Sequence, residues 1–104
     1  MMLMTTTDVI PGRSYAVLGL VMGSFVNSKD FVKDIGAGLK SLVGGELKSY
    51  TRMMEESRQQ ALTKLESEAR ALGADAVIGV RFTTSAIMQG ASEILATGTA
   101  IKFQ

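Results

Sequence analysis

The chain has 104 residues, no cysteine, no histidine and a formal net charge of +1. This length predicts a single domain with a modest core over residues 1–104. The composition excludes disulfides, thiolate or imidazole catalysis and the usual zinc sites, and the weak, mixed charge gives no electrostatic footprint for nucleic acid or an anionic membrane.

The first elements are two predicted strands followed by a helix. Residues 5–7 are predicted to form a short strand, before a turn around the single proline, Pro11. Residues 15–26 are β-branched and aliphatic, which favours a buried strand. Residues 28–43 place apolar side chains at helical spacing, after a cap at Asn27 or Ser28.

The beginning of the sequence carries no basic region of the kind that opens a signal peptide. The longest apolar stretch is also far shorter than the roughly 20 residues that a membrane-spanning helix needs. We therefore expect a cytoplasmic protein that does not span a membrane.

A second, longer helix is predicted over residues 46–72, with Gly73 as the left-handed residue that ends it. Its predicted inner stripe consists of Tyr50, Met54, Ala61, Leu65, Ala69 and Leu72. At 1.5 Å per residue this helix is about 40 Å long, whereas a compact domain of this size is only about 26 Å across. We expect one end to project and to be covered by another subunit.

Strands over residues 75–87 and 92–103, with a turn at Gln89-Gly90, complete the order β-β-α-α-β-β. The predicted fold is α/β of the α+β kind, a mainly antiparallel sheet packed on one face by two helices. With a two-residue turn, the bulky face expected to take the helices consists of Ile78, Val80, Phe82, Leu95, Ile101 and Phe103. The smaller face, expected to pack against another copy, consists of Val77, Gly79, Arg81, Thr83, Ser85, Ile94, Ala96, Gly98 and Ala100.

Several motifs resemble the YbjQ family in order and spacing. They are residues 36–45 (GAGLKSLVGG), Tyr50, residues 72–80 (LGADAVIGV) and the closing residues 98–100 (GTA). The likeness runs roughly from residue 21 to residue 101. It implies a small α/β subunit that assembles into a ring, a pentamer with strands around a central barrel. The family also carries a heavy-metal-binding label.

Arg81 is the most unusual placement, because it interrupts an apolar strand and a buried guanidinium needs several acceptors or an anion. One interpretation is a structural pair between subunits, with Glu93, Asp75 or backbone carbonyls. The other is a site for a small anion or polar ligand, to which Thr83 and Ser85 add hydroxyls on the same face.

Other motifs favour structural interpretations. The seven methionines could hold a soft metal, but Met53 and Met54 diverge by about 100° around a helix, and we predict filling of the core or an interface. Asp30 and Asp34 lack a third ligand for a hard cation. Residues 36–41 lack the glycine that a phosphate-binding loop places directly before Lys-Ser, which favours close helix packing.

The sequence therefore predicts a non-enzymatic, ring-forming homo-oligomer, a pentamer by resemblance, with an interaction or small-ligand role. Its candidate ligand or interface residues are Arg81, Thr83 and Ser85, and no catalytic residue, metal ligand or cofactor is assigned. No nucleophile–base pair stands at a suggestive spacing for an enzyme. The alternative is a metal-binding protein, as the family label suggests.

Overall fold

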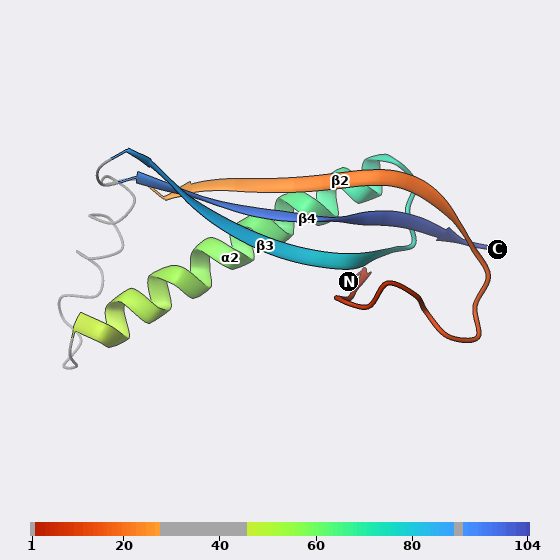
Figure 1. The fold of residues 1–104 in the computed structure, drawn as a ribbon, viewed down its shortest axis with the longest axis horizontal. Helices are drawn as coiled ribbons and strands as arrows, with labels where there is room; N and C mark the ends of the chain where they lie inside the picture. Colours follow the sequence, from red (N-terminus) through yellow and green to blue (C-terminus); the bar gives the residue numbers. More distant parts are fainter. Residues whose placement is uncertain (1, 28–45, 89–90) are drawn as a thin grey trace.

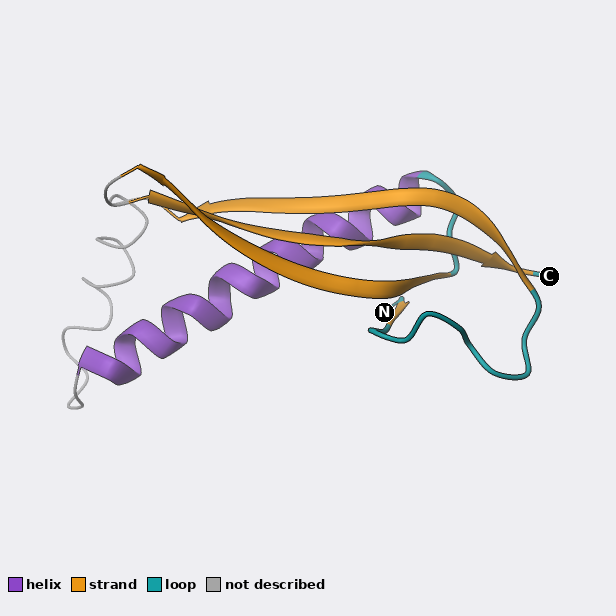
Figure 2. Ribbon diagram, in the orientation of Figure 1, coloured by secondary structure: helices purple, strands orange, loops and turns teal. Residues whose placement is uncertain are grey.

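The computed structural model describes residues 2–27, 46–88 and 91–104. Their elements are β1 (Leu3–Met4), β2 (Tyr15–Asn27), α2 (Glu46–Ala71), β3 (Ala76–Met88) and β4 (Ala91–Phe103). They form a four-stranded mixed sheet in the order β1-β3-β4-β2, crossed diagonally by α2 (Figures 1 and 2). This confirms the α+β class. The helix predicted over residues 28–43 and the turn at residues 89–90 lie outside the described residues.

The sheet is built around β4, which pairs on both sides. It is antiparallel to β2, from Tyr15 opposite Phe103 to Asn27 opposite Ser92, and antiparallel to β3. The short β1 adds to β3 in parallel, so the sheet is mixed. The first strand had been predicted over residues 5–7, and the structure places it at Leu3–Met4 instead.

One side of α2 is buried against the sheet. Its buried residues recur every fourth position: Met53, Ser57, Ala61, Leu65 and Ala69. The predicted stripe is therefore right in its second half. Met54 is half-buried and packs against the core, as predicted, although Met53 beside it is more deeply buried. Leu72 is exposed, which corrects the end of the stripe, and the side chain of Tyr50 lies outside the described ones. Gly73, with φ of 81°, ends the helix as predicted.

The face that receives α2 carries the small residues of β4, together with Val77, and not most of the bulky ones. Val21, Val77, Ile94, Ala96 and Ala100 join the helix residues in the main core. A Cβ added to Gly23 would collide with the backbone of Ala61 and Leu65, so glycine lets the helix approach the strand closely. The prediction that these small residues pack on another copy is wrong for the residues of β4.

The opposite face carries a second, smaller cluster of Ala76, Ile78 and Ile101, packed with Ile10, Tyr15 and Phe103. Four of the six residues expected beneath the helices therefore lie on the other face: Ile78, Leu95, Ile101 and Phe103. Val80 does join the helix-side core. In the described ranges, no helix combines the length and apolar character that a membrane span requires.

Candidate functional site

A β-bulge at Gly79 decides which side chains share a face with Arg81. The pairing of β3 with β4 shifts between Ile78 and Arg81, and Gly79 has φ of 61°. The extra residue reverses the alternation of side chains along β3. As a result Val77 and Val80 both belong to the helix-side core, and Arg81 lies on the face away from α2.

The three predicted site residues do lie together on that face. Arg81, Thr83 and Ser85 stand opposite Thr97, Leu95 and Glu93 of β4, and cross-strand partners share a face. The same face continues on β2. We call the following set the open face: Leu20, Met22, Ser24, Val26, Arg81, Thr83, Ser85, Glu93, Leu95, Thr97 and Thr99.

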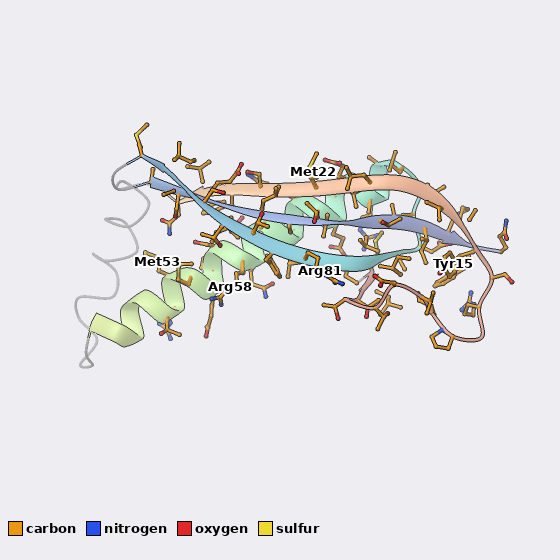
Figure 3. The ribbon with its side chains drawn as sticks, viewed as in Figure 1. Tyr15, Met22, Met53, Arg58 and Arg81 are labelled. Atoms are coloured by element: carbon orange, nitrogen blue, oxygen red, sulfur yellow. The ribbon has the colours of Figure 1, made fainter. Side chains whose placement is uncertain are left out.

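Arg81 holds the segment after β1 against β3. Its Nη1 donates to the carbonyl oxygens of Thr6, at 2.9 Å, and Val80, at 3.0 Å. Its Nη2 lies 3.9 Å from Oδ1 of Asp8. Backbone carbonyls were among the predicted partners, but here they come from the same chain. The side chain is 59% exposed, so the prediction of a buried guanidinium does not hold for the chain by itself (Figure 3).

A second polar contact on the open face joins two residues from different strands. The hydroxyl Oγ of Ser24 donates to Oε2 of Glu93 at 2.8 Å, and Ser85 stands opposite Glu93. The sequence had suggested Glu93 as a partner for Arg81 without indicating Ser24. Only the register of β2 on β4, set by residues far apart in the chain, reveals this contact.

The open face also exposes aliphatic side chains of β2. Leu20 is 66% exposed, Val26 is 48% exposed and Met22 is 45% exposed, and all three are on β2. Arg81, Thr83, Ser85 and Glu93 therefore form a polar strip beside exposed aliphatic side chains. Such a surface suits a protein interface with an apolar centre and a few fixed polar contacts.

The arrangement of acidic side chains bears on the possibility of a metal site. The described residues contain no group of three or more Asp, Glu, His or Cys side chains able to hold an ion. They therefore do not fit a hard or borderline metal, which takes oxygen, imidazole or thiolate donors. Asp30 and Asp34, and the residues 36–41 of the glycine-rich motif, lie outside the described residues.

The methionines gather more closely than their spacing suggested. Met53 and Met54, from the first half of α2, and Met88, at the end of β3, all line one pocket of about 390 Å³. Among the described residues, Asn27, Ala86, Ala91 and Ser92 also line it. Figure 3 shows Met53 on the part of α2 that diverges from the strands. No pattern in the sequence indicates this pocket, because its walls come from the sheet and the helix, which are far apart in the chain.

The buried polar atom in this lining belongs to Asn27. The residue is only 6% exposed, and its Oδ1 has no hydrogen-bond partner. Buried acceptors in proteins are nearly always paired, so this one calls for an explanation. The pocket is thus a second candidate site, on the side of the sheet opposite to Arg81.

Comparison with known proteins places the chain in a family. The model described as "Putative heavy-metal-binding" matches residues 2–104. A UPF0145 protein of Vibrio parahaemolyticus is 54% identical over 102 residues, which cover 97% of each chain. A UPF0145 protein of Fervidobacterium nodosum is 55% identical over 104 residues, which cover 99% of this chain and 96% of that protein.

A solved structure shares the fold. The crystal structure of a DUF74-family protein of unknown function from Pediococcus pentosaceus superposes with a TM-score of 0.65 at 18% identity, and the match covers 99% of this chain and 98% of the other. None of these protein descriptions mentions an enzyme activity. With a family model over nearly its whole length and relatives above 50% identity, the chain belongs to the YbjQ family, also designated UPF0145.

Proposed function

We propose that the chain is the subunit of a ring-forming homo-oligomer with a non-enzymatic interaction or small-ligand role, and that the ring has five copies, as the family resemblance implies. One observation carries this proposal. Residues 81–88 form a continuous strand, yet every one of them is exposed. A strand that is solvated on both faces stabilises little, because strands gain their stability from cross-strand and face-to-face packing.

The sheet also offers two different open edges. Among the described strands, β2 has a neighbour only on its β4 side, and β1 pairs only with residues 76 and 77 of β3. Unpaired strand edges are templates for pairing with another chain. When two different edges meet, the interface is heterologous, and a heterologous interface closes into a ring if the rotation per subunit allows it.

The shape of the chain supports the same proposal. Its radius of gyration is 16.4 Å, compared with about 13 Å for a compact domain of 100 residues. Joining β2 of one copy to residues 81–88 of the next would cover part of this extended surface. It would also place the open face, with Arg81, Thr83 and Ser85, beside the same face of neighbouring copies.

Native mass spectrometry and sedimentation velocity test this proposal. The expected result is one species with five times the mass of the 11.1 kDa chain. Val26→Lys should shift the protein toward smaller species, because it replaces an apolar side chain of the open face by a charge that the interface would have to desolvate. Val9→Lys is the matched control, since Val9 is an exposed valine outside the sheet. A wild-type monomer at micromolar concentration would overturn the proposal.

Metal binding is the second candidate function, and the shared lining of Met53, Met54 and Met88 favours it for one class of ion. Thioethers select soft cations such as Cu(I). Calorimetric titration separates the ions: heat with Cu(I) or Ag(I) but not with Zn²⁺, Ni²⁺ or Cd²⁺ would support a thioether site. An absence of heat with every ion would remove this candidate.

A further inference from the structure

We propose that β2 of one copy pairs with residues 81–85 of β3 of the next copy as parallel strands, so that the open face continues without a break from subunit to subunit. The partner is the neighbouring copy in the ring proposed above, on which this pairing rests. Two features of the sheet edges determine the direction of pairing: which backbone groups point outward, and which face the side chains of those residues occupy.

Along the edge of β2, the outward backbone groups belong to residues whose side chains lie on the open face. The amide of Met22 points away from β4, because it donates to Oε1 of Glu68 at 3.2 Å. Backbone groups and side chains both alternate along a strand. Leu20 and Ser24 therefore share the orientation of Met22. Glu68 is itself exposed, so a carbonyl oxygen of an incoming strand can take its place.

The edge of β3 has the opposite arrangement. The amide of Val80 points outward, because it donates at 3.0 Å to the carbonyl of Thr5, on the side of β3 away from β4. Pairing with β4 is regular over residues 81–86, so Phe82 also directs its backbone groups outward. Its side chain stands opposite Ala96, on the helix side of the sheet. The outward residues of the two edges thus occupy opposite faces.

This difference suits parallel strands. In a parallel pair, a residue whose backbone groups point toward the partner strand stands opposite one whose groups point away, and the two side chains share a face. Met22 can therefore stand beside Arg81 or Thr83 of the next copy, with every side chain on the open face. In an antiparallel pair, two residues that point toward each other stand opposite. That pairing would set Met22 beside Phe82 and join the open face to the helix side.

The symmetry of a ring of five copies selects the same direction. β2 and β3 run parallel to each other within one copy, because both are antiparallel to β4 (Figure 1). Antiparallel joining would reverse the strand direction from each copy to the next, and five reversals cannot close a ring. Parallel joining also covers Phe82. This residue is 43% exposed, because α2 lies chiefly over β2 and β4, and it would come beside the helix-covered β2 of the neighbour.

Paired cysteines test the direction, because the chain contains none of its own. Double variants combine one cysteine on β2, at Leu20, Met22 or Ser24, with one on β3, at Thr83 or Ser85. Ser24 and Thr83 both stand opposite Leu95. Within one copy they are therefore two strand spacings apart, about 10 Å, which is too far for a disulfide. The other combinations lie farther apart still, so every disulfide formed on mild oxidation joins two copies.

We expect at least one of these variants to give a ladder of covalent species up to the pentamer on gels without reductant. Thr84 is the matched control for Thr83, because it is an adjacent, exposed threonine on the helix side. Thr84→Cys with the same positions of β2 should give no ladder. A ladder with Thr84→Cys and not with Thr83→Cys would overturn the parallel direction. If no variant gives a ladder while native mass spectrometry reports five copies, these two edges do not pair.

Amide hydrogen exchange is a second measurement that leaves both edges unchanged. In the wild-type protein, the outward amides of Leu20, Ser24 and Phe82 should exchange at least about tenfold more slowly than in Val26→Lys, which breaks the ring. Equal exchange in the two proteins, with five copies present in the wild type, would overturn the pairing alone. A monomeric wild type would overturn the ring and the pairing together, so the two failures are distinguishable.

Discussion

Leu65 fills the contact between α2 and the sheet, where Gly23 allows the two backbones to meet. It is fully buried and belongs to the main core. Leu65→Ala should lower the free energy of unfolding by about 2–5 kcal/mol, through lost burial and the cavity left behind. Urea unfolding measures this change. Thr63→Ala, on the exposed side of the same helix, should stay within about 0.5 kcal/mol. Equal losses would show that the helix is rotated.

Glu66 connects the beginning of the chain to α2. Its Oε1 accepts a hydrogen bond from the Met2 amide at 2.9 Å and lies 3.4 Å from Nη2 of Arg70. The Met2 amide first, and then the charge of Arg70, hold the pKa of Glu66 below its ordinary value of 4.5. A lowered pKa means that the ionised form is the one the folded state stabilises.

The pH dependence of stability follows from that direction. The contribution of Glu66 should be complete above pH 4.5 and lost as the pH falls through the lowered pKa. Comparing urea unfolding of wild type and Glu66→Gln across acidic pH measures it. The gap between the two proteins should be constant near neutral pH and should narrow on acidification. A gap that widens in acid would contradict the contact with Met2.

Individual side-chain contacts were the hardest feature to predict from the sequence. Glu66 and Arg70 stand four positions apart, a spacing at which opposite charges on a helix meet, and the structure pairs them. Nothing in the sequence indicates Met2, because that contact joins residues 64 positions apart. Arg81, Thr83 and Ser85 share a face, as predicted, but it is not the face of Ile94, Ala96 and Ala100, with which the prediction had grouped them. The carbonyl of Thr6 as a partner of Arg81 depends on how the chain folds back.

At the scale of elements, the bulge at Gly79 determines which face of the sheet each later side chain of β3 occupies. Gly79→Ala should lower the free energy of unfolding by about 1–2 kcal/mol, because a φ of 61° is costly for an L side chain. Gly79→Asn should cost less, because asparagine tolerates this region better. Thermal unfolding of the two variants checks the order. If alanine is the milder change, the left-handed backbone is not what requires glycine here.

The same bulge explains why the strands were easier to predict than their faces. Periodicity located β3 and β4 to within a few residues, since their runs are strongly apolar. A strict alternation through residue 79 then put Ile78 and Val80 on one face. Gly79 inserts one residue, so Val80 packs beneath α2 while Ile78 lies opposite. A glycine inside a strand is a known signal for a bulge, but its effect on register is visible only in the pairing.

For the whole molecule, assembly and Arg81 are linked. If the open face meets its neighbours in a ring, Arg81→Ala should shift sedimentation toward smaller species, because it removes a cation and frees the segment around Thr6 and Asp8. Arg81→Lys should be partly defective, since an ammonium group lacks the planar fork that serves two carbonyls. An Arg81→Ala variant that sediments like wild type at every concentration would show that this side chain extends into water.

The pairing of β2 with β4 also has a consequence for the order in which the chain folds. β3 and β4 are neighbours in the chain and pair through a short connection, whereas Tyr15 meets Phe103 across almost the full sequence. Distant pairings close large loops, which costs entropy before any contact forms, and proteins rich in them fold slowly. We therefore expect the hairpin of β3 and β4 to form early, with β2 docking late. Until it docks, both sides of the hairpin remain unprotected, and a nascent chain is most exposed to aggregation during that interval.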